Sequence, residues 1–284
     1  RVSSSGGKTT VLPESRAVLY EQSYSSGNTR ASQDFESSFD AYDCQAADDF
    51  YVPSGQQWTI QTVTATGSGS TTATLAHVFI FYDNAGVPNA TPTVSLYNLA
   101  CTNTSAVLTI PCPGGITLGP GHYWLSVQDA SAYSTYGQWF WMQDLYAYNN
   151  VSYWRNPGNG FGTGFTTWTS LPTLGSLYTD FMFRLEGTVG PLVTCQYSIS
   201  LYDTYGDTWN GGILDVMVNG TVVLNDIACN LYGSDIPQTF YFDAWSGAAI
   251  TTSYTPGGWP YENYYRIFNY QGTQVWYSAG SYTD

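Results

Sequence analysis

Hydrophobic and polar residues alternate along most of the chain in short runs that end at Gly, Pro or Asn. A period of two is typical of half-buried strands, and no apolar stripe of helical period persists for three turns. Turn signals recur about every ten residues, as in all-β sandwiches and barrels. In the first part of the chain the predicted strands are 58–64, 77–82, 93–97, 106–110, 122–127, 138–142 and 180–187.

A second series of strands follows segment 188–192, where Gly190-Pro191 stops a strand and stiffens the connection. Asn219-Gly220, inside 214–224, is the strongest short signal for a β-hairpin. The other predicted strands are 195–202, 239–242, 249–254, 264–268 and 274–277. We therefore predict an all-β protein with two β-sandwiches in tandem, jelly-roll-like or Ig-like: an extended N-terminal arm at 1–16, a larger sandwich at 17–188 and a smaller one at 189–284.

The charge balance excludes several partners. The chain has seven basic residues, with Lys8 as the one lysine, and 21 acidic residues, which gives a net charge of −14. Such a chain cannot neutralise a run of phosphates, so nucleic acid is excluded, and anionic membrane surfaces repel it. Apolar runs such as 76–82 are too short to span a bilayer. An aromatic content of 17% also argues against disorder.

Several features favour an extracellular or cell-surface location. The chain is rich in Tyr, Thr and Gly, and its five cysteines form no C-x-x-C pair of the kind used by zinc or thioredoxin-like sites. Together with four N-glycosylation sequons, the cysteines indicate an oxidising, secreted context. The sequons predict glycosylation at Asn89, Asn103, Asn150 and Asn219.

The cysteine positions suggest two disulfides. Cys101 and Cys112 flank one hairpin and are expected to pair, and Cys195 and Cys229 are expected to pair within the second half. Each closed loop would add roughly 3 kcal/mol, mainly by constraining the unfolded chain. Cys44 is then left over. A buried free thiol is favoured for it over a bond to another chain.

Ordered sequence blocks from about Val18 to Gly187 resemble a jelly-roll-like module of secreted bacterial proteins. The matching blocks are Ala47-Asp-Asp-Phe-Tyr-Val-Pro-Ser-Gly, Trp58-Thr-Ile, Phe81-Tyr-Asp-Asn-Ala-Gly-Val-Pro, Gly119-Pro-Gly-His-Tyr-Trp-Leu-Ser-Val, Trp154-Arg-Asn-Pro-Gly-Asn-Gly-Phe and Asp180-Phe-Met-Phe-Arg-Leu-Glu-Gly. The resemblance implies a fold and a secreted address and no agreed catalytic activity.

The second half is similar to a short extracellular module with the signature D-S-Y-G-D-G-W-N-G, which here reads Asp203-Thr-Tyr-Gly-Asp-Thr-Trp-Asn-Gly. The chain departs from the signature at Thr204 and Thr208. A glycine at 208 would supply a positive φ. Such modules are usually appended to surface or secreted proteins.

The same loop is the best candidate site. Asp203 and Asp207 lie four residues apart, with Asn210 and several glycines beside them, and Glu262 in a second polar turn is expected to close the shell. Calcium takes six to eight oxygen ligands from flexible loops, so we predict a structural Ca²⁺ site. The alternative is an ordinary Asx turn, in which the acids hydrogen-bond their own backbone.

Asp48 and Asp49 stand before Phe50-Tyr51-Val52 and point to opposite faces of a strand, so they cannot both enter one core. A buried carboxylate needs a partner. We expect one of them to cap or to pair with Arg184, and the other to reach a cation or solvent.

Nothing in the sequence specifies a catalytic site. His77 and His122 each lie inside an apolar strand, which favours a packing role over general-base catalysis. G-x-S-x-G, H-E-x-x-H and phosphate-binding loops do not occur. We therefore predict that the protein is not an enzyme.

The leading functional hypothesis is a structural or adhesive extracellular subunit of a filament, surface layer or matrix. The segment Lys8-Thr9-Thr10-Val11-Leu12 would add a strand to an exposed edge of a neighbouring subunit. Repeated head-to-tail addition gives an open filament.

The alternative hypothesis is a carbohydrate-binding accessory module of a secreted enzyme. It requires exposed rings in a patch, whereas core packing consumes most aromatic residues of a sandwich. Trp139 and Trp141 share one strand face and Phe140 takes the other, so one set belongs to the core. The remaining candidates are Trp154, Trp168, Trp259 and Trp276.

Overall fold

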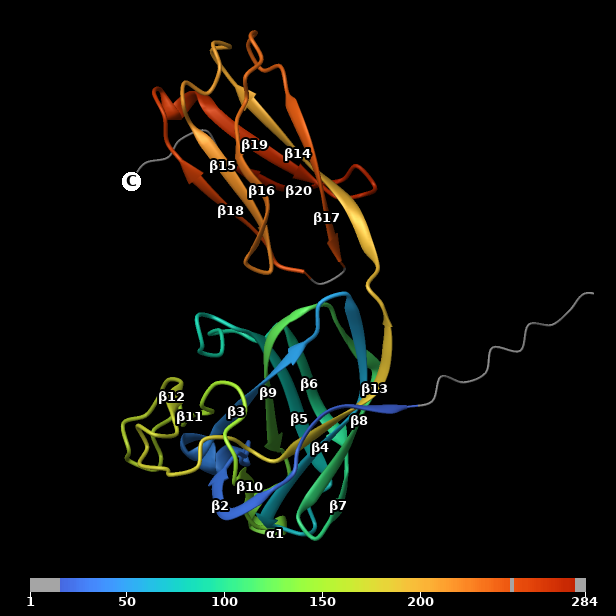
Figure 1. Cartoon of the computed structure of the whole chain (residues 1–284). Coiled ribbons are helices and arrows are strands. Elements are labelled where there is room, and N and C mark those ends of the chain that lie inside the picture. The colour runs from blue at the N-terminus through green and yellow to red at the C-terminus, as the bar shows by residue number, and fades with distance from the viewer. Residues whose placement is uncertain (1–15, 246–247, 279–284) are drawn as a thin grey trace, which may run out of the picture. The chain divides into compact units, whose positions relative to one another are not determined.

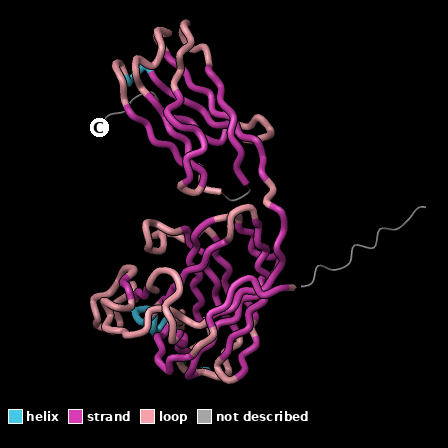
Figure 2. The backbone as a smooth tube through the Cα atoms, viewed as in Figure 1, coloured by secondary structure: helices cyan, strands magenta, loops and turns pink. Residues whose placement is uncertain are grey.

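A computed structural model describes residues 16–245 and 248–278, and nearly all of its regular structure is β-strand (Figures 1 and 2). The helical pieces in this part of the chain are η1 (Ser37–Tyr42), α1 (Tyr133–Tyr136) and η2 (Pro260–Glu262). The predicted all-β class is therefore confirmed. The chain divides into two compact units between Gly190 and Pro191. Unit 1 extends to Gly190 and unit 2 begins at Pro191.

Unit 1 contains two antiparallel sheets. The seven-stranded sheet runs β1-β13-β4-β10-β2, with β8 paired to β4 and β7 paired to β8. Its strands are β1 (Ala17–Gln22), β2 (Ser25–Ala31), β4 (Gln56–Gly69), β7 (Thr102–Thr104), β8 (Val107–Leu118), β10 (Trp139–Asp144) and β13 (Phe183–Pro191).

The six-stranded sheet of unit 1 runs β12-β11-β3-β9-β5-β6. Its strands are β3 (Gln45–Val52), β5 (Leu75–Tyr82), β6 (Val94–Ala100), β9 (Gly121–Asp129), β11 (Tyr153–Arg155) and β12 (Thr169–Ser170). Alternate residues of both sheets form one apolar core, as expected for a sandwich. The indole N–H groups of Trp139 and Trp141, both fully buried, donate to backbone carbonyls at 2.9 and 2.8 Å. These two residues belong to the core, as their shared strand face predicted.

The six-stranded sheet of unit 1 is covered on its second face too. Ala47, Phe79, Phe81 and Trp124 form a separate buried cluster, against which Tyr153 and Trp168 pack. Consequently Asp48 and Asp49 are both fully buried although they point to opposite faces of β3.

Unit 2 is a smaller sandwich. A four-stranded sheet runs β17-β14-β19-β20 and a three-stranded sheet runs β16-β15-β18. Asn219 and Gly220, both with positive φ, join β15 to β16 and form the predicted hairpin turn. The strands are β14 (Thr194–Asp203), β15 (Ile213–Val218), β16 (Thr221–Ile227), β17 (Gln238–Trp245), β18 (Ile250–Thr255), β19 (Asn263–Phe268) and β20 (Gln274–Ser278).

The core of unit 2 lies between these sheets. It is built from inward residues such as Ile199, Leu201, Val216 and Ile267, and it includes Trp209 from the loop after β14. Trp209 is 1% exposed and its indole N–H donates to the Tyr202 carbonyl at 2.7 Å. The D-x-Y-G-D-x-W-N-G loop is therefore fixed to the sandwich by its tryptophan.

Candidate metal centre

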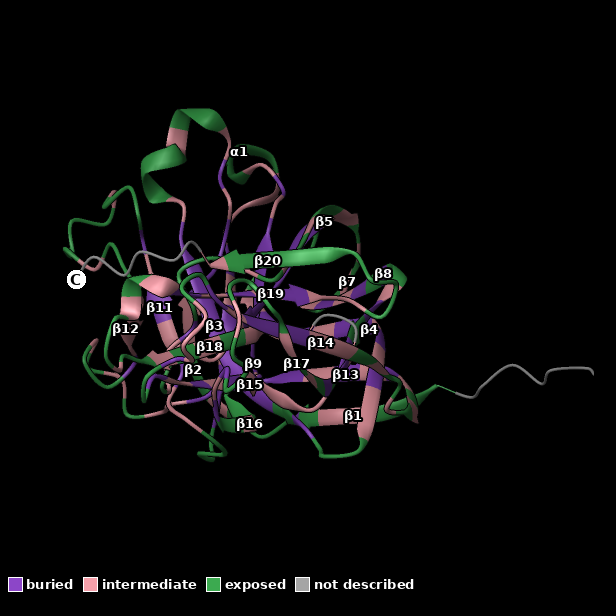
Figure 3. Cartoon of the chain, turned by 90° about the horizontal axis from the view of Figure 1, so that it is seen from above, coloured by how far each residue is buried: buried purple, intermediate pink, exposed green. Residues whose placement is uncertain are grey.

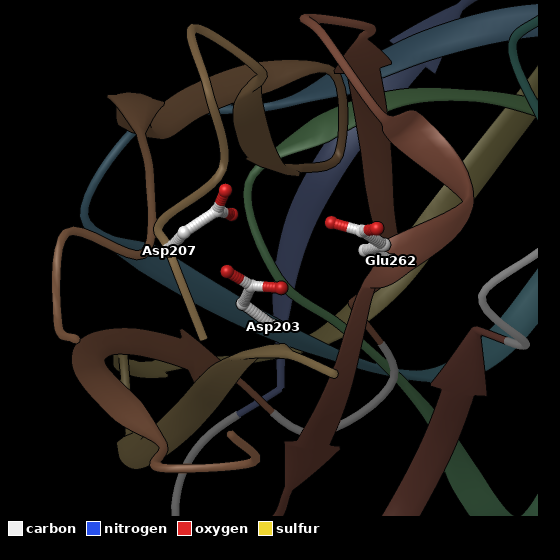
Figure 4. Close-up of side chains that lie close together, drawn as sticks. All are labelled: Asp203, Asp207 and Glu262. Carbon is white, nitrogen blue, oxygen red and sulfur yellow. The ribbon is translucent and has the colours of Figure 1, made fainter. Parts of the chain in front are cut away.

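Three carboxylates meet at one end of the larger sheet of unit 2 (Figure 4). Asp203 is the last residue of β14 and lies opposite Asn263, the first residue of β19. Asp207 belongs to the loop after β14, and Glu262 ends η2 just before β19. Each contributes an oxygen to a group in which all the atoms lie within 4.8 Å of one another. Neighbouring strands thus bring together side chains 59 positions apart in the sequence.

Backbone hydrogen bonds fix the loops that carry these side chains. The Thr204 N–H donates to the Glu262 carbonyl at 3.0 Å, and the Gly258 N–H donates to the Asn210 carbonyl at 2.9 Å. On the other side of the loop, the Asp235 N–H donates to the Asp203 carbonyl at 2.8 Å. The backbone that carries the three carboxylates is therefore fixed by hydrogen bonds between its loops.

Asp203 is the buried member of the group, with 1% of its surface exposed. Its Oδ1 accepts the Tyr205 N–H at 3.0 Å, which is the Asx turn expected as the alternative to a metal ligand. Its Oδ2 is buried and has no hydrogen-bond partner within the described part of the chain. Leaving such an atom unsatisfied costs about 1–3 kcal/mol, and more when the group is charged.

Asn210 lies beside Asp207 and orients it. The Asn210 side-chain amide donates to Asp207 Oδ1 at 2.9 Å and to the Thr208 carbonyl at 3.0 Å. Its amide nitrogen is therefore committed to the loop. Of the four residues predicted as ligands, Asp203, Asp207 and Glu262 converge, while Asn210 supports Asp207 from the side.

In the described part of the chain, no basic side chain balances the negative charge of the three carboxylates. Burial, followed by the charges of Asp203 and Asp207, raises the pKa of Glu262 above its usual value. Within residues 16–245 and 248–278, no Lys, Arg or His forms an ion pair with any of the three carboxylates. The arrangement consists of hard oxygen donors, which suits a hard cation such as Ca²⁺.

Thr208 has a φ of +84°, in the region that favours glycine. A β-branched residue there is strained by about 1–3 kcal/mol. The positive φ expected at position 208 is therefore adopted by a threonine, at a structural cost.

The two predicted disulfides are wrong, because all five cysteines are free thiols. In the first pair, the β7–β8 register places Thr102 opposite Thr109, so Cys101 comes level with Ile110 and not with Cys112. Cys44 is the buried thiol that the sequence favoured, and burial raises its pKa to about 12.

The second predicted pair fails for a different reason. The Trp209 N–H donates to the Cys229 carbonyl at 3.0 Å, which places Cys229 near the Tyr202 end of β14. Cys195 lies at the opposite end of this strand, opposite Ala244. Seven residues of extended chain span roughly 23 Å, whereas a disulfide requires Cα atoms within about 7 Å.

One of Asp48 and Asp49 was expected to cap or to pair with Arg184, and Asp48 takes the first of these roles. Asp48 accepts the backbone N–H groups of Phe181 at 2.5 Å and Asp49 at 2.9 Å. Arg184 instead contacts Glu186 at 2.8 Å. Asp180 is the acidic residue that interacts most strongly with Asp48. Burial, followed by the negative charge of Asp180, raises the pKa of Asp48 well above its usual value.

Both histidines pack against carboxylates inside unit 1. His77 is 4% exposed, lies 2.8 Å from Asp34 Oδ2, and accepts the Asn98 N–H at Nδ1. His122 Nε2 lies 2.5 Å from Asp49 Oδ2, and its ring stacks on Tyr51. No local pattern predicts these partners, because Asp34 and Asp49 lie 43 and 73 positions away from their histidines.

The remaining predicted residues are spread over the surface. Among the four sequon asparagines, Asn89 is exposed, while Asn103 donates its amide to the Ser70 carbonyl at 3.2 Å. Asn150 and Asn219 are half-buried. The arm residues Lys8, Thr9, Thr10, Val11 and Leu12 lie outside the described residues.

No protein-family model, curated protein or solved structure matches this chain. Among the described residues, no helix combines the length and the apolar character needed to cross a bilayer.

Proposed function

We propose that this chain is a non-catalytic, secreted structural or adhesive subunit that self-assembles by β-strand addition. The observation that carries the proposal is a groove of about 390 Å³ in unit 2, lined by Ile250, Thr251, Thr252, Ile267, Val275 and Trp276. Its walls come from β18 in one sheet and from β19 and β20 in the other. The resemblance to secreted modules supports the extracellular location.

The β20 strand beside this groove is suited to accept a strand. It pairs with β19 on one side, and no described strand pairs with its other edge. Four of its five residues are exposed, as Figure 3 shows along the labelled strand. Unpaired N–H and C=O groups on an edge are a template for another extended chain, whose alternate side chains would enter the groove.

The proposed occupant is segment 8–12 of a second copy. Thr9, Thr10 and Val11 are residues with high strand propensity. Residues 1–15 carry two basic side chains and one acidic side chain, while residues 191–284 carry one arginine and eight acidic residues, a net charge of −7. This charge complementarity favours the encounter of the arm of one copy with unit 2 of another.

Deletion of residues 1–13 tests the proposal. We expect the full chain to form polymers by light scattering and electron microscopy, and the deletion variant to be monomeric with an unchanged far-UV circular dichroism spectrum. Deletion of residues 1–6, which retains segment 8–12, is the matched control and should still assemble. A monomeric full chain, or polymers that persist without residues 1–13, would overturn the proposal.

A point variant tests the acceptor groove. Trp276→Ala is expected to weaken assembly at least tenfold, because Trp276 lines the groove and is 57% exposed. Trp259→Ala is the control, because Trp259 is equally exposed at 59% but does not line the groove. Equal effects of the two substitutions would reject β20 and its groove as the acceptor.

Carbohydrate binding is the second candidate, and an aromatic pocket in unit 1 favours it. Phe35, Phe39, Tyr42, Tyr133, Gln138 and Phe161 line a pocket of about 230 Å³. Phe39 and Tyr133 meet edge-to-face at 5.8 Å, as do Tyr42 and Phe161 at 5.3 Å. Aromatic faces of this kind offer apolar area beside polar groups. None of the tryptophans predicted from the sequence to contact carbohydrate lines this pocket.

A glycan array with the full chain and with Tyr133→Ala tests this second candidate. Binding that is lost in Tyr133→Ala and retained in Tyr241→Ala, an exposed tyrosine of unit 2, would support it. An array without a bound glycan would reject it.

A further inference from the structure

We propose that Asp203, Asp207 and Glu262 bind one calcium ion, which ties the loop after β14 to the turn before β19. Three carboxylates alone do not define a site, because exposed acidic groups often gather without an ion. A second feature distinguishes this group: Asp203 is 1% exposed and its Oδ2 is buried without a hydrogen-bond partner among the described residues. Figure 4 shows this carboxylate directed into the space between Asp207 and Glu262.

A cation accounts for that orphaned oxygen. A buried acceptor without a donor is costly, and the usual remedies in proteins are a hydrogen bond, an ion pair or a metal. The neighbours of Asp203 Oδ2 in the group are acceptors themselves, and no ion pair with a basic side chain occurs within the described ranges. A bound ion satisfies all three carboxylates at once.

The donor set and its spacing favour Ca²⁺. Calcium–oxygen distances of about 2.3–2.6 Å place opposite ligands about 5 Å apart, and the oxygens of the group lie within 4.8 Å of one another. Magnesium usually retains several waters and takes only one or two carboxylates. The group contains no Cys or His, the ligands that zinc commonly uses. Waters would complete the calcium shell, because Asp207 and Glu262 are partly exposed.

The ion would act as a cross-link between segments far apart in the sequence. Asp203 and Asp207 belong to one loop and Glu262 to another, and these loops already share the Thr204–Glu262 and Gly258–Asn210 backbone hydrogen bonds. Because the three carboxylates converge only in the folded chain, an ion bound there would stabilise the folded state by mass action. This inference is independent of strand addition, because neither the arm nor the groove supplies a ligand.

Isothermal titration of the full chain with CaCl₂, after removal of metal with a chelator, tests the proposal. We expect one ion per chain and a melting temperature that rises with calcium. At free calcium one hundred times the Kd, the folding equilibrium constant should increase about a hundredfold. An absence of binding heat together with an unchanged melting temperature would overturn the proposal. Magnesium that binds as tightly would overturn the assignment to calcium.

Variants locate the ion. Asp203→Asn, Asp207→Asn and Glu262→Gln should each lower calcium affinity at least tenfold, whereas Asp243→Asn, which removes an exposed acid of β17 in the same unit, should not. Glu262 is partly exposed, so Glu262→Gln remains informative even if Asp203→Asn does not fold. Wild-type affinity in both Asp207→Asn and Glu262→Gln would place the ion elsewhere.

Discussion

Two clusters of carboxylates, one in each unit, differ in their burial and in the groups that surround them. In unit 1, Asp48 and Asp180 lie in the protein interior, and backbone N–H groups of Phe181, Asp49 and Tyr148 donate to them. Burial raises the pKa of Asp180 to about 7 and that of Asp48 well above its ordinary value. In both acids a raised pKa is thus combined with backbone N–H donors to the carboxyl oxygens.

In unit 2, Asp203, Asp207 and Glu262 lie on loops, and only Asp203 is fully buried. Among the described residues, this is the only group that brings three acidic, His or Cys side chains within 4.8 Å. The buried carboxyls of unit 1 accept backbone N–H groups and have raised pKa values. The carboxyls of unit 2 converge on loops, where we propose a cation site.

The largest effect is expected from Asp48→Ala. It leaves the N–H groups of Phe181 and Asp49 without their buried acceptor, which should lower the free energy of unfolding by about 3–5 kcal/mol. Urea denaturation of the full chain measures the loss. Asp48→Asn keeps an acceptor oxygen and should lose less than half as much. Equal losses in the two variants would show that the backbone donors do not hold this side chain.

The pH dependence of stability comes next in size. The folded pKa of Asp180, about 7, lies above its ordinary value of 3.8, so the folded state binds more protons and its stability falls as pH rises from about 4 to 7. Asp180→Asn cannot ionise and so avoids this loss. Between pH 4 and pH 8 its free energy of unfolding should rise by on the order of 2 kcal/mol relative to that of the wild type. Urea midpoints across this range test it. Parallel curves for the two proteins would mean that Asp180 ionises normally.

The smallest predicted effect concerns the loop of the cation site. Thr208→Gly relieves a positive φ and should raise the free energy of unfolding by about 1 kcal/mol, although glycine normally destabilises. Thr204→Gly is the control, because Thr204 is not among the residues with positive φ and should lose stability. Thermal denaturation in excess calcium compares them. Destabilisation by both substitutions would argue that Thr208 is not strained.

Local sequence signals predicted much of the fold. Alternation located the strands of both units, as in Cys195–Tyr202 of β14, because one face of each strand is buried. Asn219-Gly220 predicted its hairpin because both residues adopt positive φ readily. Likewise, Asp203 and Asp207 were found from their spacing within one loop.

Partners set by long-range register escaped prediction. Asp48 accepts a hydrogen bond from the N–H of Phe181, 133 residues away, and no local sequence pattern predicts such a contact. Cys195 and Cys229 were expected to pair, yet Cys195 lies at the start of β14 and Cys229 lies near the other end of that strand. In both cases the sheet order, and not the local pattern, decides which side chains meet.

Hydrogen exchange of the full chain, followed by mass spectrometry with and without calcium, tests the contrast between the clusters most directly. We predict slower exchange in residues 203–210 and 257–263 when calcium is present, and no change in residues 144–152 and 179–183 around the buried acids of unit 1. Protection spread equally over both clusters, or absent from the unit 2 loops, would contradict the account.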